Sequence, residues 1–442
     1  MRYCIHKTYY IAVLLFLVFT SVTFSQENVT SKFLLEEVIQ LALKNNQALK
    51  VSDKYISIAQ QQTEINKLQQ LPNIASSINA SYIGDVLILD KDFSNSTTVD
   101  MPHFGNTFSV QASQVIFKGN AINNSIKIGS LQEELAKLDY RDDELSINLL
   151  VTATYLDLFK LYNQKTVYNQ NIVLAEERLK NINNFYNQGM VTRNEVIRGE
   201  LQLTNLKQAV ETISNNISIL NKQLTTAIGL SDATIILPDE SLLEQKPTIE
   251  GFDFYSGEGF ANNPKIKSTQ VQTELVKKTA EITKSEMLPA LVAFGGYNMQ
   301  RPITSTSPAL DMYSNSWQVG VGLSFDIESL YKTPKKLKLN NLQLDQMKEV
   351  ELLQKQNLDV EIKAAYLKYQ DAVSQSNTFI ESKRLAEENY HIIEKKYLNQ
   401  LALAVDMLDA SNAKLGAELN YTNSEINILY TYYNLLRTIG KL

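Results

Sequence analysis

Between residues 168 and 224, apolar residues recur at steps of three and four. This spacing is the pattern of a coiled-coil seam, in which one stripe of a helix packs on a neighbouring helix. The seam is formed by Ile172, Ala175, Leu179, Ile182 and Tyr186, and then by Leu203, Leu206, Val210, Ile213, Ile217, Leu220 and Leu224. Gly189 interrupts it between the two groups. The pattern predicts a long antiparallel helical hairpin with its tip at residues 187–194.

A second pattern, strict alternation, precedes the long helices. Apolar residues alternate with Gln, Gly, Ser or Asp throughout 317–326, and most of 108–117 behaves in the same way. Such alternation is typical of a membrane barrel strand, with lipid on one face and water on the other. Soluble hairpins with one face on a protein core would alternate too. We favour membrane strands because each candidate lies between two helices, the first of which ends at a Leu-Pro pair.

Weaker alternation supplies partners for these strands. Ile74–Tyr82 and Leu291–Met299 complete two predicted β-hairpins, at about 74–117 and 291–327. The small residues of Gly320-Val321-Gly322 lie within a strand and are best explained as facing a lumen.

Polar stretches inside both hairpins predict external loops. Residues 84–104 and 300–314 are rich in Ser, Thr, Asn and Asp, and they contain Pro102, Pro302 and Pro308.

The helix lengths are consistent with a hollow cylinder. A helix over 124–187 would span roughly 96 Å, whereas helices over 47–71 and 192–229 would span roughly 38 and 57 Å. Two short helices placed end to end therefore match one long helix. Each set of helices can contribute two full-length strips to the wall of a tube.

The whole arrangement occurs twice. Tyr155-Leu156 corresponds to Tyr366-Leu367, and Ile228-Gly229 corresponds to Ile439-Gly440, both at an offset of 211 residues. The sequence thus predicts an internal two-fold repeat. We expect a first repeat at 26–229, a linker or equatorial segment at 230–251, and a second repeat at 252–442, with its own tip near 398–405.

The N-terminal residues predict export. Arg2 and Lys7 precede a short apolar run at 11–19, as in a secretory signal peptide covering residues 1–25. The run is too short to cross about 30 Å of hydrocarbon. Removal of this segment would take away Cys4, the single cysteine, and would change the formal charge from -6 to 40 - 48 = -8.

Composition excludes several classes of function. A mildly acidic chain without a basic stripe argues against binding of nucleic acid. His103 and His391 are the histidines that remain after cleavage, and they suit an external loop and a coiled-coil helix. These two histidines are too few and too far apart in the predicted fold to form a histidine-rich metal site or a catalytic triad. We therefore expect no enzyme, no metal and no cofactor.

Four strands per chain cannot close a membrane barrel, because single-chain barrels begin at eight strands. The chain must therefore associate if it spans a membrane. Two copies give eight strands and a filled interior, whereas three give twelve strands and room for a lumen. We favour three.

Several ordered motifs resemble the TolC-type outer-membrane efflux proteins. They are the signal peptide, the opening Leu-Glu-Glu-Val-Ile-Gln-Leu-Ala-Leu-Lys-Asn-Asn at 35–46, the Leu-Pro pairs before strands, Gly-Met-Val-Thr-Arg-Asn-Glu-Val-Ile at 189–197, and Ala-Ile-Gly-Leu at 227–230. The resemblance covers nearly all of residues 33–442. It implies a mainly α protein with a transmembrane β part: a long antiparallel coiled-coil α-barrel joined to a trimeric 12-stranded β-barrel, with four strands per chain.

The same resemblance implies the function and the partners. A homotrimer in outer-membrane lipid, with a periplasmic helical extension, would be the exit duct of a tripartite efflux or type I secretion system. An inner-membrane pump and a periplasmic adaptor would dock at the helical tips. These adaptor-contact tips are Gly189, Met190, Val191 and Thr192 in the first repeat, and Gln400, Leu401, Ala402 and Leu403 in the second. Substrates would pass unchanged, and their identity lies with the pump.

The resemblance also places a constriction at the periplasmic entrance. The matching residues are Asp406 and Asp409, which share one helix face because they are three positions apart. Three copies would bring six carboxylates toward one axis and attract cations. Alternatively, Asp406 merely complements the positive helix N-terminus, as Glu195 does in the first repeat.

Two further expectations concern the tips. A hydrogen bond from Tyr397 to Glu195 could latch the closed entrance, although Tyr397 also suits the seam. Thr192 and Glu195 form a capping-box pattern, whereas Leu403 stands at the cap of the second tip and should weaken that helix start by ~1 kcal/mol.

The alternative to a duct is a structural periplasmic coiled-coil spacer or adhesin without a pore. It would not need lipid-facing strands, so the alternation at 317–325 favours the duct.

Overall fold

The computed structural model describes residues 29–244, 247–306 and 308–442. The predicted signal peptide lies outside the described residues. Two compact units form, each from segments of both repeats. The first unit comprises the chain up to Lys50, Glu144–Tyr255 and Ile362–Leu442, and the second comprises Val51–Asp143 and Ser256–Glu361.

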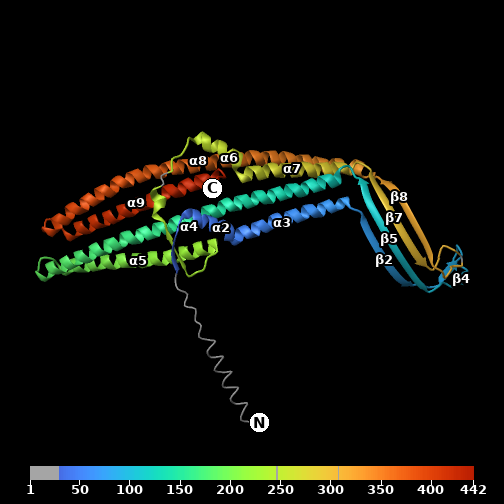
Figure 1. The fold of residues 1–442 in the computed structure, drawn as a ribbon, viewed down its shortest axis with the longest axis horizontal. Coiled ribbons are helices and arrows are strands. Elements are labelled where there is room, and N and C mark those ends of the chain that lie inside the picture. Colours follow the sequence, from blue (N-terminus) through green and yellow to red (C-terminus); the bar gives the residue numbers. More distant parts are fainter. Residues whose placement is uncertain (1–28, 245–246, 307) are drawn as a thin grey trace, which may run out of the picture. The chain divides into compact units, whose positions relative to one another are not determined.

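Helices of two lengths dominate the chain, in an order that repeats (Figure 1). The first set is α2 (Leu35–Asn45), α3 (Gln47–Lys67), α4 (Ala121–Asn187) and α5 (Arg193–Ile228), and the second is α6 (Phe252–Asn262), α7 (Pro264–Ser285), α8 (Ser329–Leu398) and α9 (Ala404–Thr438). The predicted helices and tips are confirmed to within a few residues. A 3₁₀ turn at Leu68–Gln70 replaces the end predicted for the first short helix. None of the described helices has an uncharged apolar stretch long enough to cross a membrane.

Four strands form one antiparallel sheet in the second unit (Figure 1). They are β2 (Asn73–Tyr82), β5 (Phe104–Phe117), β7 (Ala290–Arg301) and β8 (Ser314–Ser324), in the order β2-β5-β7-β8. The two hairpins predicted from alternation are therefore both present, and β5 pairs with β7 to join them.

The first external loop is more ordered than predicted. Residues 84–104 contain a small hairpin of β3 (Val86–Leu89) and β4 (Ser96–Val99), which the prediction of a loop did not include. The run Val-Leu-Ile-Leu of β3 does not alternate, and all four side chains are exposed. Periodicity therefore carries no signal for this strand.

The linker predicted at 230–251 also contains regular structure. β6 (Thr234–Pro238) pairs in parallel with β1 (Val29–Phe33), and a 3₁₀ turn, η2, follows at Glu240–Glu244. Both strands have five residues and a single partner. Such short segments do not show a recognisable period in the sequence.

Tyr155 lies at the centre of the first unit's core. Its side chain is fully buried, and its hydroxyl donates to the carbonyl of Phe33 at 2.7 Å and accepts from the amide of Asp239 at 2.8 Å. The hydroxyl thus holds the segment around β1 to the segment after β6. Burial raises the pKa of Tyr155 to about 12.

The helix ends of the two repeats share one conformation. Gly229 after α5 and Gly440 after α9 both have positive φ, at 72° and 79°, as helix C-terminal glycines commonly do. At the first of these ends the Asn45 and Asn46 amides donate to the carbonyls of Ile228 and Ala227, each at 3.0 Å. These bonds satisfy carbonyl groups that a helix end leaves unpaired.

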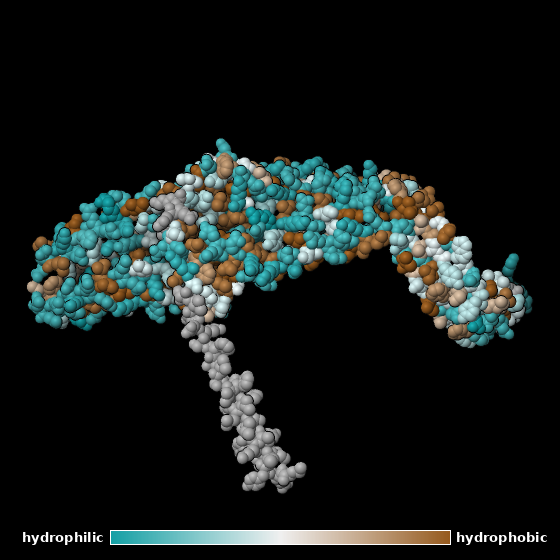
Figure 2. Space-filling view, viewed as in Figure 1, coloured by the Kyte–Doolittle hydropathy of each residue, from teal (hydrophilic) through white to brown (hydrophobic). Residues whose placement is uncertain are grey.

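The second unit differs from the first in where its apolar residues lie. Its strands carry exposed apolar side chains, including Trp317 at 76% and Val319 at 76% exposure. Figure 2 shows apolar residues gathered where the helices of this unit meet its strands. Exposure on this scale marks a surface that contacts lipid or other protein.

Candidate functional site: the hairpin tips and the two faces of the sheet

The two tips have the same backbone conformation despite different sequences. Gly189 has φ of 75°, and Gln400, at the corresponding place, has φ of 62°. Each tip is closed by the same pair of hydrogen bonds, of which the longer-range one runs from Met190 to Phe185 in the first tip and from Leu401 to Lys396 in the second. Left-handed backbone is unfavourable for a residue with a Cβ, so Gln400 carries strain that Gly189 does not.

The helix starts are capped in the opposite way from our prediction. Thr192 makes no side-chain capping bond, and the amide of Glu195 donates only to the backbone carbonyl of Thr192. At the second tip, the Asp406 carboxylate accepts from the amide of Leu403 at 3.0 Å. The expected weaker cap at the second tip was wrong, because the carboxylate three residues into the helix supplies the acceptor that the Leu403 side chain lacks.

Asp406 and Asp409 are both exposed, whereas the residues that follow each of them, Met407 and Ala410, are buried. The two carboxylates therefore lie on the solvent side of α9, as their spacing predicts. The bond to Leu403 means that Asp406 also serves its own helix N-terminus. The alternative role that we left open for Asp406 is thus present in the chain.

The predicted hydrogen bond from Tyr397 to Glu195 is absent, and that prediction was wrong for the single chain. Within the described residues, the Tyr397 hydroxyl is buried and has no hydrogen-bond partner. Its ring packs edge-on to Phe185 at 6.3 Å between centroids, in an apolar cluster with Ile182, Val196 and Met407. Burial, followed by the charge of Glu195, raises the pKa of Tyr397. These contacts agree with the alternative interpretation, in which Tyr397 is a residue of the apolar coiled-coil seam.

Arg178 makes the polar connection between the two hairpins that we did not predict. This residue of α4 donates to Gln202 Oε1 of α5 at 3.0 Å and to Ser411 Oγ of α9 at 3.0 Å. A longer contact of 3.5 Å reaches the Tyr390 hydroxyl of α8, which in turn donates to Glu394 at 2.9 Å. One guanidinium therefore contacts all three other helices of the paired hairpins.

The sequence pattern gave no signal for this site, because the seam continues without a break from Ala175 to Leu179. Arg178 adjoins the seam residue Leu179, and Tyr390 lies at the same level of the second hairpin. Burial raises the pKa of Tyr390. Arginine presents a rigid fork of donors that suits several acceptors at once.

The tips themselves also touch. The Gln400 side-chain amide lies 3.7 Å from the sulfur of Met190. Val191 and Ala402 pack against the apolar cluster, whereas Leu401 is 77% exposed. The predicted tip residues of the two repeats are therefore neighbours, and they present apolar side chains to solvent.

The register of the sheet sorts its residues onto two faces, because cross-strand partners share a face. One row of partners is Ser77, Ser109, Asn298 and Ser316, and another is Ala75, Gln111, Gly296 and Gln318. The rows between them belong to the opposite face, and one of these consists of Ser76, Val110, Tyr297 and Trp317. One face is thus mostly polar and the other mostly apolar, as in a strand between water and lipid.

No group of three or more His, Cys, Asp or Glu residues suited to a metal ion occurs in the part of the chain that the structure describes. His103 lies in the external segment between β4 and β5, stacked on Tyr82 at 5.2 Å, and His391 lies on α8 beside Glu394.

Comparison with known proteins places this geometry in a family. The sequence model of the outer membrane efflux protein family matches residues 38–230 and 257–441. The chain is 22% identical over 436 residues to the outer membrane efflux protein BepC of Brucella suis, covering 96% of this chain and 90% of BepC.

Solved structures share the fold at low sequence identity. The CmeC outer membrane channel of Campylobacter jejuni superposes with a TM-score of 0.75 at 17% identity, covering 92% of this chain and 85% of CmeC. The outer membrane protein VceC of Vibrio cholerae gives 0.74 at 13% identity, covering 92% of this chain and 96% of VceC. With the family match over most of its length, the chain belongs to the outer membrane efflux protein family and is a TolC-like exit channel of the outer membrane with a periplasmic helical extension.

Proposed function

We propose that three copies of this chain form a homotrimer around one bore, with twelve strands in contact with outer-membrane lipid and the helices forming a periplasmic tunnel. The main support is the sheet. Its edge strands β2 and β8 have no further partner among the described strands, and one of its faces is apolar and exposed. Four strands cannot close a barrel, whereas twelve can enclose a lumen.

The repeats are part of the same proposal. Residues 26–229 and 252–442, joined by the segment 230–251, would each supply two strips of the tunnel wall. The repeated order of helices and strands supports this division.

We further propose that the tips receive a periplasmic adaptor, which connects the duct to an inner-membrane pump. The first tip is Gly189–Thr192 and the second is Gln400–Leu403. Met190, Leu401 and Leu403 are 52%, 77% and 69% exposed. Apolar side chains exposed on adjacent loops suit a protein partner. The duct would pass its substrates without chemical change, and the pump would select them.

Asp406 and Asp409 are proposed as the constriction of the periplasmic entrance. Their exposure on one side of α9 supports this role. The bond from Leu403 to Asp406 fixes the position of that carboxylate without neutralising its charge. Six such carboxylates near a threefold axis would repel each other and favour cations.

The Arg178 network replaces the latch that we expected from Tyr397. It joins α4 to α5, α8 and α9 within one chain. An entrance that widens by moving one hairpin relative to the other must break the contacts with Ser411 and Tyr390, which lie on the second hairpin. We propose that Arg178 holds the hairpins in the closed arrangement.

Ion conduction in planar bilayers tests the proposal. Detergent-purified protein should have the mass of three chains and should form cation-preferring channels. The double variant Asp406→Asn with Asp409→Asn should lower the cation preference. Glu195→Gln, the corresponding change in the first repeat, should leave it nearly unchanged. Equal effects of the two changes would remove Asp406 and Asp409 from the entrance.

The spacer or adhesin without a pore predicts different behaviour. Its monomers would stay dissolved without detergent and would leave bilayers electrically silent. Membership of an efflux family supports the duct.

A further inference from the structure

Phe294 is an aromatic residue on the polar face of the sheet. In the register of β7, its partners on either side are Ser113 of β5 and Gly320 of β8, and Ser113 itself pairs with Asn73. In one direction the next rows of this face carry Gln and then Ser, and in the other the next row is Val115, Val292 and Gly322. Phe294 nevertheless remains 41% exposed. In a channel whose polar face lines the water, this ring is an apolar surface within the lumen.

Two glycines of β8 determine how the ring lies. A Cβ built on Gly320 would be 3.0 Å from Cζ of Phe294 and 3.5 Å from both Cε atoms, and one built on Gly322 would be 3.7 Å from Cε1. The ring therefore occupies the space that side chains at these positions would fill. The far end of the ring thus lies over Gly320 of β8, while 41% of the side chain stays exposed.

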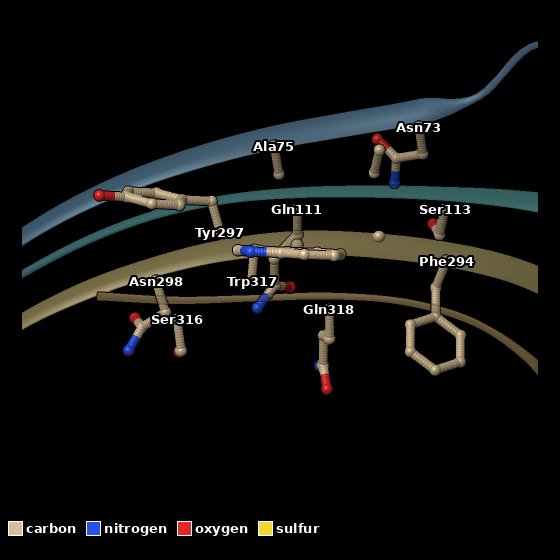
Figure 3. A pocket seen from close by; sticks show the side chains of 13 residues that line it. Asn73, Ala75, Gln111, Ser113, Phe294, Tyr297, Asn298, Ser316, Trp317 and Gln318 are labelled. Carbon is tan, nitrogen blue, oxygen red and sulfur yellow. The ribbon is translucent and has the colours of Figure 1, made fainter. Parts of the chain in front are cut away.

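The ring borders a hollow of about 370 Å³ on the sheet (Figure 3). In Figure 3, Phe294, Asn298, Ser316 and Gln318 extend to the same side of their strands. The described residues that line the hollow include several amides and hydroxyl groups but no charged side chain. Its volume lies within the range of small-molecule sites, roughly 300–1,000 Å³.

We propose that Phe294 and the amides beside it form a transit site for neutral, planar aromatic groups of the exported compounds. The inference rests on the exit-duct function and names a substrate class for it. The exposed part of the ring offers offset or edge-on stacking to a second ring. Asn298 and Gln318 each provide a donor and an acceptor beside it. Because the lining carries no charge, the site does not select for ions.

A purely structural role for the ring must be separated from this one. An aromatic side chain laid over a cross-strand glycine supports strand pairing by itself. Leucine at position 294 would still cover Gly320 with apolar atoms, but it could not stack. The replacement Phe294→Leu therefore tests stacking with little change in packing, and Phe294→Tyr should preserve it.

The experiment measures protection of a reporter cysteine that lines the hollow. Ser113→Cys is introduced with Cys4→Ser, which leaves one thiol because Cys4 is the single cysteine. Channels in lipid vesicles are labelled with a charged, membrane-impermeant methanethiosulfonate, with and without N-acetyltryptophanamide as the neutral aromatic probe. The aliphatic control is N-acetylleucinamide, and the control reporter is Ser109→Cys, on the same face but outside the hollow.

The aromatic probe should slow labelling at position 113 and not at position 109. Phe294→Leu should weaken that protection roughly 2- to 12-fold, the range measured for aromatic pairs, and Phe294→Tyr should retain it. Equal protection with leucine, or no protection in the parent channel, would overturn the transit site. Ion conduction by the same vesicles is read in parallel. Conduction without protection refutes the site alone, whereas silent vesicles refute the duct itself.

Discussion

Replacing Arg178 with Met tests the connection between the two hairpins. The change keeps a long apolar stem but removes the donors to Gln202 and Ser411, each at 3.0 Å. Gln202 lies on α5, in the same hairpin as Arg178, so only the bond to Ser411 joins the two hairpins. A hydrogen bond from a charged donor contributes about 1.5–3 kcal/mol, so the hairpins should lose about 2 kcal/mol of mutual stabilisation. The 3.5 Å contact with Tyr390 is too long to add much.

A loss of about 2 kcal/mol shifts an equilibrium between closed and open entrances roughly 30-fold. Single-channel recordings of Arg178→Met in planar bilayers should therefore show a large increase in time spent at high conductance. Ser411→Ala removes the same bond between the hairpins and should give a shift of similar size. Because both changes remove the same bond, the double variant should open no more than Arg178→Met alone.

Two results would refute this reasoning. Unchanged recordings for Arg178→Met would show that the network does not restrain the entrance. Fully additive effects of Arg178→Met and Ser411→Ala would show that the two side chains act independently. Circular dichroism of each variant is the control, because a partly unfolded hairpin would also alter conductance.

Burial raises the pKa of Tyr155 to about 12, compared with about 10 in the unfolded chain. The protonated hydroxyl therefore contributes its full stabilisation below pH 10, and this contribution is lost as the pH rises through 12. Tyr155→Phe should cost about 2 kcal/mol at pH 7, for two lost hydrogen bonds, and should flatten that alkaline decline in urea unfolding curves. Val321→Arg puts a charge on the apolar face of the sheet and should destabilise each chain by ~2–4 kcal/mol. Detergent-stable oligomers should then be absent from gels, whereas Gln318→Arg, on the polar face, should leave them intact. Asp406→Ala removes a capping bond and should speed hydrogen exchange at the second tip by roughly fivefold, for about 1 kcal/mol; Glu195→Ala, which removes no such bond, should change exchange at the first tip less than twofold.

The two tips show how one backbone conformation can be reached with different residues. Gly189 adopts positive φ without cost, whereas Gln400 adopts it despite its Cβ. The Gln400 side chain reaches Met190 of the other tip at 3.7 Å. The sequence difference at this position therefore gives the second tip a contact that a glycine could not make.

Periodicity in the sequence determined the architecture of this protein. Steps of three and four specified the helical hairpins, alternation specified β2, β5, β7 and β8, and the offset of 211 residues specified their duplication. These patterns are readable because each reports which side of a regular element faces apolar surroundings. The short strand pairs β1–β6 and β3–β4 were not predicted, because strands of five or fewer residues are too short to show a period.

The partners of individual side chains were decided by the tertiary structure alone. Tyr397 is buried without a hydrogen-bond partner among the described residues, and Arg178 connects the hairpins in its place. Spacing along the chain gives the face of a helix but not the distance to a residue more than two hundred positions away. A hydrogen bond requires a donor–acceptor distance within a range of a few tenths of an ångström. Which of these bonds exist is therefore determined by how the four helices pack.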